Sequence, residues 1–228
     1  MVRLQGYPFR AFVCLALLAT VGSSLWGCSG KKIDDADPGA LYKMAEDDIA
    51  NDQYLLALEK LKLVRNKFPY SNFATQAQLR IADVYYLQDS YVESAAAYES
   101  FNDLHPKHEK VPYAMFRAAE SYFNDIPSPI ARDLTPAKKA EDAYNEFLKR
   151  FPGDPQAGTA RAHLEQARTV LAEKELYIAN FYYKQDQFES AKRRYEKLLT
   201  VYPETKHAKE AREKLTLTEQ KTAKSTHP

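Results

Sequence analysis

The chain has 228 residues, and its 32 lysines and arginines nearly balance its 31 aspartates and glutamates. Nucleic-acid binding is not expected, because it requires concentrated positive charge that a near-neutral chain lacks. Glycine occurs only seven times, whereas tight strand turns and phosphate-binding loops both draw on it. The composition therefore favours helices joined by Pro, Asn and Asp turns, in one domain or one repeat array.

The first 27 residues have the layout of a secretory signal peptide. Arg3 and Arg10 form a basic flank, and the apolar run 11–20 that follows is too short to span a bilayer. It leads to Leu25-Trp26-Gly27-Cys28, which resembles a lipobox, the motif whose cysteine receives a diacylglyceryl group. Trp26 is bulky where small residues are usual. An ordinary cleaved signal peptide followed by an incidental cysteine is the alternative.

Cysteine usage favours the lipid interpretation. Cleavage before Cys28 removes Cys14, so the mature chain would hold one cysteine and no internal disulfide. A lone thiol is a liability in an oxidising compartment, whereas a thioether is not. We predict Cys28 as the attachment site of a diacylglycerol and an N-acyl chain, which together hold a protein on a membrane. Ser29 favours sorting to the outer membrane by resemblance to enterobacterial lipoproteins, and no further cofactor or metal is predicted.

The polar segment 28–38 is expected to be a tether that precedes a repeat array over 39–220. Four prolines, each preceded by an aromatic residue or His, mark four helical units. Side chains that are mainly apolar or small recur at the positions fifteen, twelve, eight and five residues before each proline. This spacing places them on one face of a helix. The prolines are Pro69, Pro106, Pro152 and Pro203.

Each unit also has an upstream helix marked by a shared alanine, followed three residues later by Tyr in three of the units. These alanines are Ala45, Ala82, Ala119 and Ala179. A small residue facing an aromatic one lets two helices approach closely, so each unit is predicted to be a helical hairpin. The expected units are 39–70, 73–107, 113–153 and 157–204, then a capping helix 206–219 and a polar tail 221–228.

Two irregularities distinguish the third and fourth units. The third contains an inserted loop at 126–135, where Thr135 is expected to cap a helix that starts with Pro136. The fourth has extra residues without a helix breaker, which predicts one continuous helix over 157–185. The connecting turns offer Ser71, Asp154 and Thr205 as expected N-caps.

The Ala, aromatic and Pro positions resemble the tetratricopeptide repeat. That resemblance implies an all-α fold of helical hairpins forming a short superhelix (an α-α solenoid) without a sheet. Together with the lipobox, the inserted loop, the long helix and the segment LYIANFYYKQDQFESA, the chain resembles the BamD (ComL) family of outer-membrane lipoproteins. Members commonly carry five repeats, and a complete fifth hairpin is missing here, which leaves any contact made by that repeat in doubt.

The resemblance implies a non-catalytic scaffold for the assembly and insertion of outer-membrane β-barrel proteins. Its expected partners are the C-terminal segments of unfolded barrel substrates, a BamA-like barrel component and other lipoproteins of the assembly machinery. The expected location is the periplasmic face of the outer membrane, through the lipid anchor. Alternatives are a structural envelope lipoprotein, such as a pilus pilotin or a cell-division adaptor, and a non-catalytic subunit of a cell-wall enzyme.

The first helices of stacked hairpins line an extended binding surface. By register with the family, this surface is faced by the residues one after, four after and three before the shared alanine of each unit. Aromatic residues are common at surfaces where partner segments bind. We call this set the first-helix face. Its predicted members are Tyr42, Glu46, Ile49, Leu79, Asp83, Tyr86, Phe116, Glu120, Phe123, Asn180 and Tyr183. Packing against the adjacent repeat is the alternative for each.

Enzymatic motifs with a known mechanism are absent from the sequence, so no catalytic residue is predicted. His105 and His108 lie on either side of Pro106 in a connecting turn, with Glu109 as the nearest carboxylate. A solvated turn is the expected role of this pair, in preference to a metal site.

Overall fold

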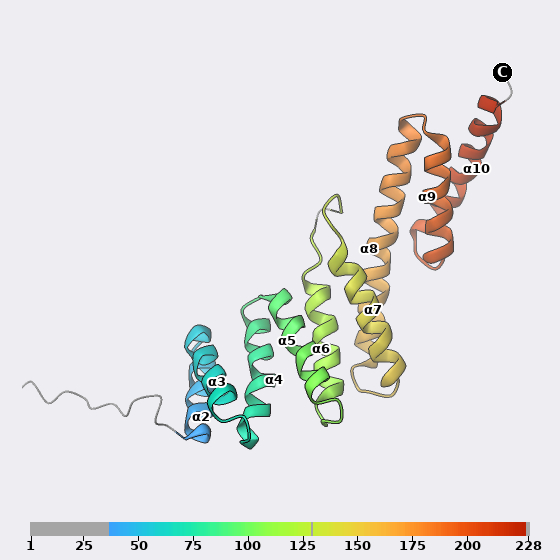
Figure 1. The fold of residues 1–228 in the computed structure, drawn as a ribbon. Coiled ribbons are helices and arrows are strands. Elements are labelled where there is room, and N and C mark those ends of the chain that lie inside the picture. Colours follow the sequence, from blue (N-terminus) through green and yellow to red (C-terminus); the bar gives the residue numbers. More distant parts are fainter. Residues whose placement is uncertain (1–36, 129, 227–228) are drawn as a thin grey trace, which may run out of the picture. The chain divides into compact units, whose positions relative to one another are not determined.

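The computed structural model describes residues 37–128 and 130–226. The predicted signal peptide and lipid site Cys28 lie outside these residues. Within them the secondary structure is α-helical without strands, so the predicted all-α hairpin-repeat fold is confirmed (Figure 1). The helices are α2 (Pro38–Ala50), α3 (Tyr54–Lys67), α4 (Asn72–Leu87), α5 (Tyr91–Leu104), α6 (Val111–Asn124), α7 (Thr135–Arg150), α8 (Ala157–Lys184), α9 (Phe188–Val201) and α10 (His207–Thr226). In this part of the chain, no helix has the length and apolarity needed to cross a membrane.

Three of the four hairpins reverse direction at an aspartate with positive φ. Asp52, Asp89 and Asp186 have φ angles of 57°, 56° and 55°, a left-handed conformation that Asp adopts more readily than most side chains. A tyrosine two residues later closes the first two turns. The hydroxyl of Tyr54 donates to Asp52 and that of Tyr91 to Asp89, each at 2.7 Å. The sequence pattern built on prolines did not identify these turns.

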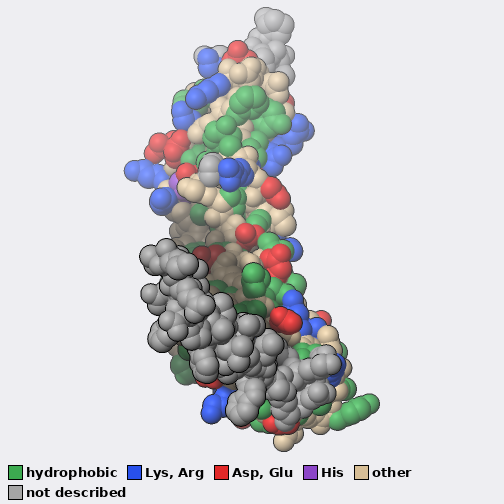
Figure 2. All heavy atoms as spheres, turned by 90° about the vertical axis from the view of Figure 1, so that its left-hand side faces the viewer, with side chains coloured by type: hydrophobic (Ala, Val, Ile, Leu, Met, Phe, Trp, Pro, Cys, Tyr) green, Lys and Arg blue, Asp and Glu red, His purple; other side chains and the backbone are tan. Residues whose placement is uncertain are grey.

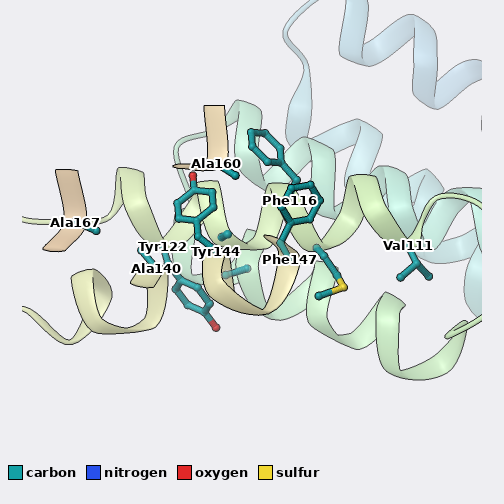
Figure 3. Close-up of a cluster of buried hydrophobic side chains, with 11 residues drawn as sticks. Val111, Phe116, Tyr122, Ala140, Tyr144, Phe147, Ala160 and Ala167 are labelled. Carbon is teal, nitrogen blue, oxygen red and sulfur yellow. The ribbon is translucent and has the colours of Figure 1, made fainter. Parts of the chain in front are cut away.

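The alanine-against-aromatic packing predicted for each hairpin is present in the core. The shared alanines are completely buried, as are Tyr98, Tyr144 and Tyr195 on the second helices. In one cluster of buried side chains, Tyr144 and Phe147 of α7 pack beside Phe116 of α6 (Figure 3). Each hairpin also packs on the next, so burial runs along the array in the way repeat proteins require.

The long helix α8 is present as predicted and serves two hairpins. Its first half packs on α7 and its second half on α9. Arg168 lies at the junction and pairs with Glu141 of α7, with Glu204 at 2.6 Å and with the Val201 carbonyl at 2.5 Å. This one guanidinium therefore joins the third and fourth units.

The inserted loop of the third unit is held against α8. Lys174 Nζ donates to the backbone carbonyls of Ile130, at 2.7 Å, and Arg132, at 3.1 Å. The predicted Thr135 cap is wrong, because Leu134 is the N-cap residue and Thr135 is already helical. The Thr135 amide and hydroxyl instead donate to Asp133 Oδ1, which satisfies the amide from outside the helix.

Two other expected caps also differ from the structure. Asp154 lies before the N-cap of α8 and accepts from the Gln156 amide at 2.8 Å, while Thr205 donates to the Tyr202 carbonyl. Ser71 does occupy the N-cap of α4, although without a capping side-chain bond. The polar tail expected from residue 221 is wrong up to Thr226, because α10 continues to that residue.

Candidate functional site

The first-helix face divides into buried and partly exposed members. Ile49 and Phe116 are buried, and Phe116 stacks edge-on against Tyr144 and Phe147. These two side chains pack inside the array in this structure. The other nine members are partly exposed and stay candidates for contact with a partner.

On α2 and α4 the face is organised by Arg80. Its guanidinium makes a bidentate pair with Glu46, with N–O distances of 2.8 and 2.9 Å, and reaches Asp83 at 3.3 Å. A bidentate arginine–carboxylate pair fixes geometry as well as charge. Burial and the neighbouring Glu46 raise the pKa of Tyr42 to about 12, so this hydroxyl stays protonated at neutral pH.

Asp83 connects this pair to the second and third units. It accepts hydrogen bonds from the hydroxyls of Tyr98, at 2.6 Å, and Tyr113, at 2.8 Å. Burial, and then the nearby Asp83 charge, raises the pKa of Tyr98 far above its usual value. The carboxylate is therefore surrounded by donors and acts as a fixed acceptor in the wall of the face.

A cavity of about 290 Å³ opens beside these groups. Its walls come from α2, α4, the end of α5 and the turn between α5 and α6. They are Tyr42, Thr75, Gln76, Leu79, Arg80, Asp83, Phe101, His108, Glu109 and Lys110. Three members of the first-helix face, Tyr42, Leu79 and Asp83, thus line one cavity. The Arg80 guanidinium and the Lys110 ammonium line the same cavity.

Further along, α6 repeats the arrangement around Arg117. Its guanidinium carbon lies 3.5 Å from the centroid of the Tyr86 ring, and its Nη1 pairs with Glu120 at 2.6 Å. Asn124 donates to the Tyr86 hydroxyl at 2.7 Å. Stacking on an aromatic ring suits the planar guanidinium of arginine, so Tyr86 and Glu120 are held in place by one side chain.

The remaining members lie in the third and fourth units. Phe123 stacks face to face with His163, with ring centroids 4.4 Å apart. Asn180 accepts from the Tyr195 hydroxyl at 2.6 Å, and Tyr183 packs edge-on against Phe188. Asn180 and Tyr183 thus contact the facing helix of their own hairpin, whereas the stacking of Phe123 of α6 on His163 of α8 links the third unit to the fourth.

Arg80 and Arg117 were missed at the sequence level although a signal was available. Both stand two residues before the shared alanine of their unit, where Lys43 stands in the first unit. A basic residue repeated at one position of three consecutive units marks a shared role. In the second and third units that role is to hold acidic members of the face, since Arg80 pairs with Glu46 and Arg117 with Glu120.

The expectation of a plain solvated turn around Pro106 is only partly met. His105 Nε2 lies 2.9 Å from Gln78 Oε1, and both histidine rings pack on Phe101. Among the described residues, no group of three or more His, Cys, Asp or Glu side chains is placed to hold a metal ion.

Comparison with protein families gives one match over most of the chain. Residues 34–226 match the family model YfiO, described as an outer membrane lipoprotein. The chain belongs to this family. An N-terminal lipid anchor, predicted above at Cys28, agrees with that description.

Relatives with assigned names are also similar over most of the chain. The outer membrane protein assembly factor BamD of Vibrio cholerae is 28% identical over 202 residues, which cover 84% of each chain. BamD of Neisseria meningitidis serogroup A is 28% identical over 227 residues, covering 92% of this chain and 85% of its own. Among solved structures, a tetratricopeptide repeat protein from Parabacteroides merdae is 18% identical, with a TM-score of 0.43, and covers 83% of this chain and 76% of its own.

Proposed function

We propose that this protein is a lipid-anchored, non-catalytic scaffold in the assembly of outer-membrane β-barrel proteins. The family match and the names of the relatives support this role. The structural observation behind it is the row of half-buried aromatic and acidic side chains on α2, α4 and α6, beside the cavity lined by Tyr42, Leu79 and Arg80. A surface of this type binds extended segments instead of small substrates.

The cavity suits a chain end that carries an aromatic side chain. Leu79 and Phe101 supply apolar walls, while Tyr42 supplies an amphipathic edge. Lys110 brings a positive charge to the same hollow, and Arg80 already shares its charge with Glu46. The C-terminal segment of an unfolded barrel substrate offers an aromatic ring and a carboxylate, and we assign it to this cavity.

The C-terminal half would dock the periplasmic domains of a BamA-like barrel component and contact other lipoproteins of the assembly machinery. Figure 2 shows hydrophobic side chains between lysines and arginines over the C-terminal helices. On α8, Tyr177 and Phe181 are about half exposed, at 51% and 53%. Exposed aromatic residues on one helix face are frequent anchors of protein interfaces.

Depletion in the native cell tests the overall role, with variants introduced to test the cavity. Loss of the protein should lower the level of outer-membrane β-barrels, and normal levels would contradict the proposal. Leu79→Glu puts a second carboxylate beside Asp83 and should fail to restore barrel levels. Leu55→Glu changes an exposed leucine on α3 that does not line the cavity, and should restore them.

Affinity purification of the detergent-extracted protein tests its partners. Recovery of a BamA-like barrel protein is expected. Recovery of secretin or Tol components without a barrel protein would instead favour a structural envelope lipoprotein, such as a pilotin or cell-division adaptor.

A further inference from the structure

The two edges of the first three hairpins differ in charge. We define the connecting edge as the start of α2 together with the links from α3 to α4, from α5 to α6 and from α7 to α8. Each link includes the end of one helix, the turn and the start of the next helix. The residues of this edge are 37–40, 65–72, 102–112 and 148–158. The hairpin edge comprises the turns within each unit, residues 47–54, 86–93, 124–128 and 130–135. In Figure 1 the connecting edge lies along the lower side of these hairpins.

The connecting edge is basic and the hairpin edge is strongly acidic. In the connecting edge, cationic side chains outnumber carboxylates. The cations are Arg65, Lys67, Lys107, Lys110, Lys149 and Arg150, and the carboxylates are Asp37, Asp103, Glu109 and Asp154. The hairpin edge has Asp47, Asp48, Asp52, Asp89, Glu93, Asp125 and Asp133 against Arg132 alone. Within the described part of the chain, Lys107 and Lys149 have no ion pair.

The connecting edge also presents isolated apolar side chains to solvent. Tyr70 is fully exposed, at 101%, in the turn after α3, and Leu104 is 65% exposed at the end of α5. Tyrosine beside lysine and arginine is the combination found at membrane–water interfaces, where the ring sits among headgroups and the cations reach lipid phosphates. The exposed leucines Leu55 and Leu56 lie in the first turn of α3, directly after the acidic hairpin edge, which an anionic lipid surface repels.

The position of the tether favours the same edge. The N-terminus of α2 lies beside that of α4, since the rings of Tyr42 and Phe73 are 5.7 Å apart. The chain from Cys28 to Asp37 has ten residues, which extend at most roughly 33–36 Å. A lipid anchor at Cys28 therefore keeps the start of α2, the first part of the connecting edge, within that distance of the bilayer surface.

We propose that the connecting edge of the first three hairpins rests on an anionic lipid surface, with Tyr70 at headgroup depth and Lys107 and Lys149 facing lipid phosphates. This contact rests on the lipid anchor of the proposed function and adds an orientation to it. The hairpin edge then faces away from the bilayer. The first-helix face runs between the two edges and stays open to the periplasm.

Vesicle binding without the anchor tests the charge of the edge. The mature chain with Cys28→Ser should float with vesicles of phosphatidylethanolamine and phosphatidylglycerol, less so at high salt, and not with phosphatidylcholine vesicles. Lys107→Gln with Lys149→Gln should weaken binding roughly fivefold per charge. The matched control, Arg132→Gln with Arg193→Gln, removes the same charge elsewhere and should bind as before. Equal loss in both pairs, or no preference for anionic lipid, would overturn the proposal.

Tryptophan depth tests the orientation in the full lipidated chain. Trp26 is the single tryptophan of the chain and is lost with the signal peptide, so Tyr70→Trp introduces a lone probe. On vesicles, brominated lipids should quench this probe and leave Leu55→Trp unquenched. Quenching of Leu55→Trp alone, or of both equally, would contradict the orientation.

A further readout separates this inference from the proposed function. The lipidated Lys107→Gln, Lys149→Gln chain should still restore barrel levels on depletion, because its acyl chains and first-helix face are intact. If the vesicle tests fail while barrel levels still depend on the protein, the lipid contact is wrong and the scaffold role stands. If the mature chain carried no acyl groups, the anchor on which the proposed lipid contact rests would be absent, and the proposed contact would be wrong.

Discussion

Replacing Arg168 by methionine should partly uncouple the two halves of the array. Methionine keeps much of the apolar stem that packs near Tyr202 while it removes the charge and three hydrogen bonds. The Glu141 side chain is only 5% exposed, and breaking a buried pair costs about 3–5 kcal/mol. Lys138 still pairs with Glu141 at 3.0 Å, and the Arg168 side chain is itself 24% exposed. We therefore expect a loss of about 2–3 kcal/mol.

Urea unfolding followed by circular dichroism measures this loss in the mature chain with Cys28→Ser. Arg161→Met is the matched control, because Arg161 lies on the same helix and donates only to the Pro152 carbonyl at 3.3 Å. Its effect should stay within about 0.5 kcal/mol. Adding Glu141→Gln to Arg168→Met should recover part of the loss, since the double variant no longer holds the buried carboxylate that Arg168 had paired. If Arg168→Met is no more destabilising than Arg161→Met, the role assigned to this junction is wrong.

Three further predictions concern the core and titrating groups. Ala119→Leu should destabilise the fold by roughly 1–3 kcal/mol, because the completely buried methyl group of Ala119 lies between α6 and its neighbours. Thermal unfolding measures this loss, and an unchanged midpoint temperature would argue against the packing of small residues against large ones. Burial, and then neighbouring His108, lowers the pKa of His105 below 6.5, so the unfolded chain binds more protons near pH 6 and stability falls as the pH drops through 6.5. His105→Gln should flatten that slope in unfolding curves, and an unaltered slope would exclude His105 as its source. Burial raises the pKa of both Tyr42 and Tyr195 from 10.0 to about 12. Between these pH values the folded state keeps protons that the unfolded state releases, so the free energy of unfolding should fall as the pH rises from about 10 to 12. Ultraviolet titration should show Tyr42→Phe and Tyr195→Phe each removing one late-ionising phenol, and normal ionisation near pH 10 would contradict the burial argument.

The helical hairpins could be predicted because each one depends on contacts close in sequence. The shared alanine, the facing aromatic and the terminating proline lie within one unit, and their spacing follows from helix geometry. The long helix α8 was predictable for the same reason, since its sequence contains no proline between Ala157 and Lys184 and its one glycine, Gly158, stands in the first turn.

The candidate site was harder to predict because it depends on contacts between units. Ile49 and Phe116 occupy the register expected for a partner surface, yet packing in the folded array buries both. The repeated basic position could have singled out Arg80, but its partner could not be assigned without knowing that Glu46, 34 residues earlier, lies beside it. Exposure at one register position is therefore set by the packing between units as well as by the repeat itself.

The C-terminal helix shows a similar limit. Its sequence beyond residue 219 is polar, and polarity suggested a tail. In the structure Thr218 is completely buried and Lys192 of α9 pairs with Glu219 at 3.7 Å. Thr222 also lines a hollow with Phe188 and Ser190 of α9, so contact with α9 accompanies α10 past residue 219, where its sequence alone did not predict a helix.

Site-specific photocrosslinking in cells tests most directly whether the first-helix face receives substrate segments. A photoreactive amino acid at Leu79, in the cavity wall, should crosslink to newly made barrel proteins, and a free peptide with their C-terminal sequence should compete. The same probe at Leu55, in the first turn of α3 and outside the cavity walls, should give no such product. Crosslinks from Leu55 alone, or from neither position, would contradict the claim that this face binds the substrate.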